Sequence, residues 1–148
     1  MPDLRLSAVP APARLLGFAG LIPFAVFGLA ALLAPEAWAG PARATLANYA
    51  ATILAFLGGC RWGFAAAGMG EGPATTPLVL AVMPSLWAWV ALSAPAPLNL
   101  LMLAVGLAAL LAADLALVKT GGAPAWWPSL RWPLTGGAVA ALLLGAFG

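Results

Sequence analysis

Residues 98–118 form an apolar run of 21 residues that contains a single charged side chain, Asp114. A helix of about 20 residues crosses the ~30 Å hydrocarbon core of a bilayer. In lipid, every backbone N–H and C=O group must find its partner inside the protein, and a lone segment achieves this only as a helix. The run therefore predicts an α-helix that spans a membrane.

The rest of the chain has the same apolar character. Only 7% of its 148 residues are charged and 64% are hydrophobic, whereas a soluble domain carries about 25% charged residues. A soluble chain of this length buries only about two-thirds of its surface on folding, which would leave too much apolar surface in water. We therefore expect a single transmembrane domain over residues 1–148, with the lipid bilayer as its solvent.

Clusters of glycine and proline divide this apolar sequence, and such clusters interrupt helices. They predict an all-α fold, a polytopic helical bundle with about five spans. The first apolar run is longer than the core of a secretory signal, so we expect it to remain as an anchor. The clusters occur at 35–41, 68–73, 94–97 and 119–131, and the spans are predicted near 15–34, 44–68, 77–94, 98–118 and 132–148.

The basic residues predict the orientation of the bundle, because short cytoplasmic loops are enriched in Lys and Arg. Four basic residues precede the first span or lie in the second and fourth loops, and the other side holds one, Arg43. The N-terminus is therefore expected in the cytoplasm and the C-terminus in the periplasm. The four residues are Arg5, Arg14, Lys119 and Arg131.

The composition also argues against several classes of function. The chain has no histidine, the commonest metal ligand and general base, and its one cysteine, Cys60, cannot form an intrachain disulfide. No nucleophile–base pair, metal-ligand set or phosphate-binding glycine loop is present, and the basic residues form no run that would bind nucleic acid. We expect no enzymatic activity, no cofactor and no nucleic-acid partner.

Arg61 and Asp114 are the only opposite charges within the predicted spans. The second and fourth spans run in the same direction, which places both residues about 6–11 Å inside the same membrane face. Each charge alone would cost roughly 2.5–3.5 kcal/mol at mid-helix, and less at this depth. We predict a direct or water-linked ion pair, which requires these two spans to be neighbours. The alternative is that Arg61 extends alone to the lipid headgroups.

Gly59 and Gly63 have the GxxxG spacing that allows two helices to approach closely. The partner helix could belong to this chain or to another protein.

Three tryptophans lie close to Arg131, just before the last predicted span. This pattern is typical of a membrane-interface belt, with amphipathic rings at headgroup depth and an arginine that reaches phosphate. A surface that binds quinone or lipid headgroups is the alternative. The members of the predicted belt are Trp126, Trp127, Arg131 and Trp132.

Five blocks of the sequence together resemble a known family. They are "LLGFAGLIPF" (15–24), "NYAATILAFLGGCRWG" (48–63), "PSLWAWVAL" (84–92), "AADLALVK" (112–119) and "LRWPLT" (130–135). They are similar to the small multi-span family of unknown function that includes transmembrane protein 69 of animal mitochondria and proteobacterial relatives. "FLGG-x-x-WG" is the most specific element. The resemblance implies a multi-pass protein of the bacterial inner membrane and supplies no established activity or catalytic residue.

The short loops, the small-residue helix faces and this resemblance favour one function. We expect an accessory or assembly subunit of a larger energy-transducing complex, respiratory or photosynthetic, that acts by helix–helix and lipid contacts with other membrane subunits. The alternatives are a small transporter or channel and a quinone- or lipid-binding membrane protein.

Overall fold

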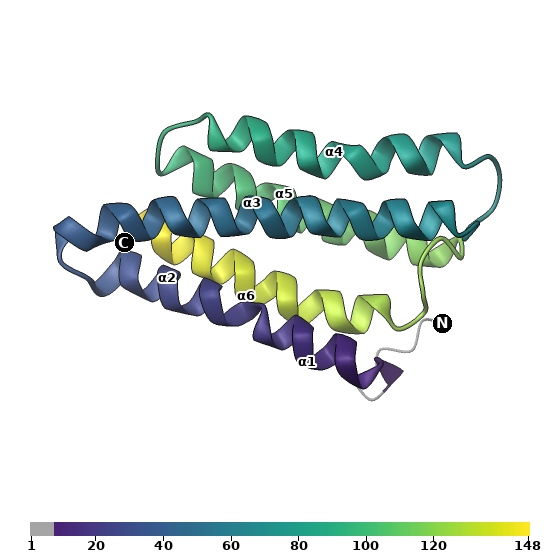
Figure 1. Cartoon of the computed structure of the whole chain (residues 1–148), viewed down its shortest axis with the longest axis horizontal. Helices are drawn as coiled ribbons and strands as arrows, with labels where there is room; N and C mark the ends of the chain where they lie inside the picture. The colour runs from purple at the N-terminus through teal and green to yellow at the C-terminus, as the bar shows by residue number, and fades with distance from the viewer. Residues whose placement is uncertain (1–7) are drawn as a thin grey trace.

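The computed structural model of the chain describes residues 8–148, and over these residues its secondary-structure elements are all α-helices joined by short loops (Figure 1). The expected all-α fold is confirmed. The helices are α1 (Ala11–Ala19), α2 (Leu21–Leu33), α3 (Glu36–Ala66), α4 (Thr75–Leu92), α5 (Leu98–Lys119) and α6 (Trp127–Phe147).

The helices form five rods, because the backbone stays helical at Gly20 and α1 continues into α2. Over residues 8–148, four rods are long and apolar enough to span a membrane: α1–α2, α4, α5 and α6. The fifth rod, α3, is less apolar because Arg43, Asn48 and Arg61 interrupt it. It is nevertheless about 46 Å long and packs against α2, α4, α5 and α6.

Two helices begin earlier than the proline-rich segments predict. The second span was expected from residue 44, but α3 begins at Glu36 and continues through Pro41. The last span was expected from residue 132, but α6 begins at Trp127. Pro128 lies in the first turn of α6, where the N–H that proline lacks has no partner within the helix. The prolines at these two places therefore lie within helices and do not end them.

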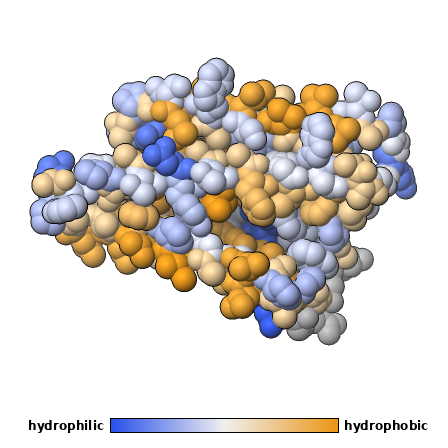
Figure 2. Space-filling model, viewed as in Figure 1, coloured by the Kyte–Doolittle hydropathy of each residue, from blue (hydrophilic) through white to orange (hydrophobic). Residues whose placement is uncertain are grey.

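The core lies where α3 and α5 meet the other rods. Five leucines there have no exposed surface: Leu46, Leu54, Leu100, Leu103 and Leu142. Small residues allow the closest helix contacts, as is common in membrane bundles. At Gly28 of α2, an added Cβ would lie 3.0 Å from the carbonyl oxygen of Ala141 on α6. Large apolar side chains gather on the outer surface, where lipid would cover them (Figure 2).

The two ends of the bundle correspond to the two groups of loops in the predicted topology. The start of α1, the α3–α4 loop and the α5–α6 loop lie at one end, and the C-terminus lies at the other (Figure 1). Which end faces the cytoplasm stays a prediction.

Candidate functional site

Asp114 of α5 is the centre of a buried polar cluster. Its side chain is 1% exposed and both carboxylate oxygens accept hydrogen bonds. Oδ1 accepts from Nη1 of Arg61 on α3, at 2.5 Å. The structure thus joins Arg61 and Asp114 directly, and α3 and α5 are neighbours. Arg61 is only 7% exposed, so it does not extend to lipid headgroups in this structure.

A second arginine, Arg131, completes the cluster, although the sequence predicts it in the membrane-interface belt. Nε of Arg131 donates to Oδ2 of Asp114 at 2.9 Å, and the indole Nε1 of Trp127 donates to the same oxygen at 2.8 Å. Nη1 of Arg131 donates to the hydroxyl of Thr135 at 2.8 Å. We call Arg61, Asp114, Trp127, Arg131 and Thr135 the Asp114 cluster.

The predicted membrane-interface belt is therefore wrong for Trp127 and Arg131, which are 7% and 2% exposed. Trp126 is half-buried and its ring packs edge-on against Trp127. Trp132 alone has the expected outward position, with 55% of its surface exposed.

The early start of α6 explains this difference. Trp127, Arg131 and Thr135 are spaced four residues apart, so in one helix they share a face. The predicted span begins at residue 132, which places Trp127 and Arg131 in a loop. The face that they share with Thr135 is therefore not apparent from that prediction. The W-x₃-R-x₃-T spacing could have revealed it if the helix had been extended through Pro128 and Pro133.

The cluster carries an excess of positive charge. Among residues 8–148, two guanidinium groups meet one carboxylate, which leaves a net charge of +1. Each charged residue lies about 6–8 Å from the end of its helix, all at the same end of the bundle. Nη2 of Arg131 is buried and has no hydrogen-bond partner in the described part of the chain. An orphaned donor on a charged group is expensive in a medium of low polarity.

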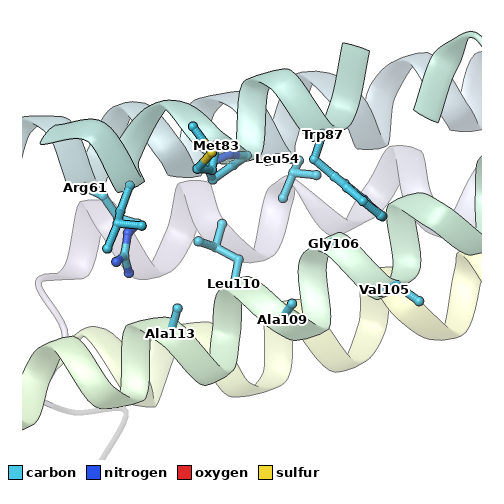
Figure 3. A pocket seen from close by; sticks show the side chains of 11 residues that line it. Leu54, Arg61, Met83, Trp87, Val105, Gly106, Ala109, Leu110 and Ala113 are labelled. Atoms are coloured by element: carbon cyan, nitrogen blue, oxygen red, sulfur yellow. The ribbon is translucent and has the colours of Figure 1, made fainter. Parts of the chain in front are cut away.

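Two cavities flank the cluster. The first, of about 300 Å³, lies between α3, α4 and α5, and Arg61 lies at one end of it (Figure 3). Its other walls are apolar, with Met83, Trp87 and Leu110 among them.

The second cavity, of about 320 Å³, is bounded mainly by α1, α2, α3 and α6, and we call it the α2–α6 cavity. Its polar wall comes from Trp127, Arg131 and Thr135, and the rest is almost entirely apolar. Figure 2 shows a hollow between α3 and α1 with hydrophilic atoms at its floor.

The predicted packing glycines do not contact another helix of this chain. A Cβ added at Gly59 or Gly63 would meet nothing within 4 Å, and both residues are exposed. The interpretation as a contact within the bundle is wrong. The neighbouring Gly58 makes that contact instead, since its added Cβ would lie 2.6 Å from the carbonyl oxygen of Ala81 on α4.

Comparison with known proteins agrees with the resemblance predicted from the sequence. A family model described as "Protein of unknown function (DUF3429)" matches residues 9–147. Transmembrane protein 69 of Xenopus tropicalis is 38% identical over 144 residues, which cover 93% of this chain and 54% of that protein. The chain thus spans about half the length of this curated relative. No solved structure matches.

Proposed function

The chain belongs to the DUF3429 family of proteins of unknown function, and we propose that it acts as a subunit that binds another membrane protein through the outward face of α3. The proposal depends on one observation. Asn48 lies near the middle of the 31-residue α3, is exposed, and its side-chain amide has no hydrogen-bond partner among residues 8–148. Hydrocarbon offers no partner to such an amide, so facing lipid there is unfavourable.

Small and polar residues continue this face along α3. Thr52 follows one turn after Asn48, and its hydroxyl donates to the Asn48 carbonyl. Gly59 and Gly63 follow within about 60° around the helix axis at 100° per residue, and both are exposed. We call Asn48, Thr52, Gly59 and Gly63 the outer stripe of α3. A partner helix could approach the glycines closely and hydrogen-bond to the amide.

In this proposal the chain is not itself an enzyme. It is an accessory or assembly subunit of a larger energy-transducing complex in the bacterial inner membrane. The bacterial and mitochondrial membership that the family resemblance implies supports that class of complex. The outer stripe of α3 supports association with a helix of another membrane protein, whichever complex that protein belongs to.

Co-purification tests this proposal. The wild-type protein, Asn48→Leu and the control Val105→Leu would each be purified in mild detergent, with co-purifying chains identified by mass spectrometry. Val105 is 59% exposed on α5, away from the stripe. We expect a stoichiometric redox complex with the wild type and the control, and its loss with Asn48→Leu while the protein still accumulates.

Two other results would overturn the proposal. Unchanged association in Asn48→Leu would show that the stripe is not the contact. A homogeneous homo-oligomer with no other chain would favour the small transporter or channel instead.

A second candidate function is the binding of a lipid or a quinone. The specific observation in its favour is that each cavity is mainly apolar and has one arginine of the Asp114 cluster in its wall. Ligand pockets commonly combine an apolar wall with a few polar groups that orient the ligand.

A further inference from the structure

We infer that the α2–α6 cavity binds a single-chain amphiphile with an anionic head, a long-chain carboxylate, and that Arg131 holds the head. This inference rests on the second candidate function and names the chemical class of the ligand. It concerns the end of the cavity where α6 begins, next to the Asp114 cluster.

The hydrogen bonds of Arg131 leave one donor group available. Nε is used by Asp114 and Nη1 by Thr135, and both acceptors are fixed inside the bundle. Nη2 is the one buried side-chain N or O atom without a hydrogen-bond partner in the described part of the chain. The side chain is 2% exposed and lines the cavity. A ligand oxygen beside Nη2 would satisfy this donor with a charge-assisted hydrogen bond.

The charge of the cluster favours an anion over a neutral acceptor. A quinone carbonyl could accept a hydrogen bond from Nη2, but it would leave the net charge of +1 on the cluster. A carboxylate both accepts the bond and neutralises that charge. In surroundings of low polarity this second effect is much stronger than in water.

The size and the apolar lining of the cavity favour a ligand with a single alkyl chain. Its volume of about 320 Å³ lies at the lower end of the ~300–1,000 Å³ range of ligand pockets. Beyond the polar wall, its lining is the apolar surface that an alkyl chain needs, with Leu21, Phe24, Ile53 and Leu57 among the residues. The exposed side chains of Leu16 and Phe56 also line it, so the cavity reaches the lipid-facing surface.

Cys60 allows a direct binding experiment, because it lines this cavity, is half-buried and is the one cysteine of the chain. The rate of its alkylation by N-ethylmaleimide would be measured on the full chain in neutral detergent. The probes are palmitate, hexadecanol, decylubiquinone and dioleoyl phosphatidylglycerol. We expect saturable slowing by palmitate and none by hexadecanol, which has the same chain length without the charge.

Two kinds of variant connect that protection to the cavity and to Arg131. Arg131→Gln should raise the half-protecting palmitate concentration roughly tenfold or more, as the loss of a charge-assisted bond implies, and Arg131→Lys should retain part of the affinity. Ala13→Trp would fill the cavity from its α1 side, whereas Ala11→Trp lies outside the lining. The first should abolish protection and the second should preserve it, with thermal unfolding confirming that both fold.

A relocated thiol controls for effects on alkylation in general. In Cys60→Ala combined with Ala109→Cys, the thiol lies in the cavity between α3, α4 and α5, and palmitate should not slow its alkylation. Equal protection by hexadecanol, or protection by phosphatidylglycerol alone, would overturn the inference. Protection by decylubiquinone alone would overturn the inference of a carboxylate ligand and would support quinone binding instead. Absence of protection by every probe would overturn the inference and, with it, the binding of a lipid or a quinone in the α2–α6 cavity.

Discussion

Asp114 on α5 and Arg131 on α6 share a 2.9 Å hydrogen bond between Oδ2 and Nε, at a depth where neither residue is more than 2% exposed. The same carboxylate binds Arg61, so one acid pairs with two arginines on two different helices. Asp114 therefore links α3, α5 and α6 at one end of the bundle. Because two positive side chains share one negative side chain, removing the acid and removing one arginine should differ in their effects on stability.

Asp114→Asn should be more damaging than Arg61→Gln. The first change leaves two guanidinium groups without a counter-charge, and breaking a buried pair in this way costs about 3–5 kcal/mol. The second leaves the neutral pair of Arg131 and Asp114 intact. Membrane accumulation and thermal unfolding in one detergent would measure both variants. Equal or reversed damage would contradict the role of Asp114 as the shared counter-charge.

Gly58 and Gly59 should respond in opposite ways to alanine. An added Cβ at Gly58 lies 2.6 Å from the carbonyl oxygen of Ala81, a backbone atom that cannot easily move, and overpacking of this kind costs about 1–3 kcal/mol. At Gly59 the added methyl meets nothing, and alanine improves helix propensity by up to about 1 kcal/mol. We expect a lower unfolding temperature for Gly58→Ala and an unchanged or higher one for Gly59→Ala. The same shift in both variants would contradict the observed rotation of α3.

Larger side chains at Gly59 and Gly63 should affect association and leave folding intact. Gly59→Leu combined with Gly63→Leu adds bulk to the outer stripe of α3, where an added Cβ meets no other atom of the bundle within 4 Å. A partner helix that depends on close approach would be displaced. The double variant should accumulate normally and lose its co-purifying chains. Normal association would remove these glycines from the proposed contact.

Arg43 should stabilise the opposite end of the bundle. Nε donates to the carbonyl of Gly145 in α6 at 3.1 Å, and Nη2 donates to the carbonyl of Ala31 in α2 at 3.3 Å. Both carbonyls lie in the last turn of a helix, where acceptors lack helical partners and a cation is favourable. Arg43→Gln should lower the free energy of unfolding by about 1–2 kcal/mol.

Glu36→Gln provides the matched control for Arg43. Glu36 is 91% exposed and its carboxylate is 4.0 Å from Nη1 of Arg43, and ion pairs at such exposed sites contribute little. Thermal unfolding of this variant should match that of the wild type. A loss as large as that of Arg43→Gln would assign the stabilisation to the ion pair rather than to the helix ends.

The orientation of the bundle can be tested with a reporter enzyme that is active only in the periplasm. Fusion after Gly148 should give an active reporter, and fusion after Gly70 an inactive one. Gly70 lies between α3 and α4, at the end of the bundle opposite the C-terminus. The expectation follows from the excess of basic residues on the Gly70 side. The reverse pattern would contradict the charge rule for this chain.

The sequence by itself determined that lipid is the solvent of this chain and that its fold is helical. It also determined how deep the two charged residues of the spans lie. Apolar runs of about 20 residues can satisfy their backbone groups in lipid only as helices. The constant rise of 1.5 Å per residue then placed Arg61 and Asp114 at one depth, whichever way each helix was rotated. Both conclusions need only positions along a helix axis, and a linear sequence provides those directly.

The tertiary structure alone decided which way each helix is rotated. Gly58 and Gly59 are adjacent in sequence but about 100° apart around α3, and only the first meets a neighbouring helix. In a soluble protein the polar face of a helix would reveal its outward side. In lipid both faces are apolar, so that signal is largely lost. Packing therefore brought Arg131 into the Asp114 cluster and left Asn48 facing outward.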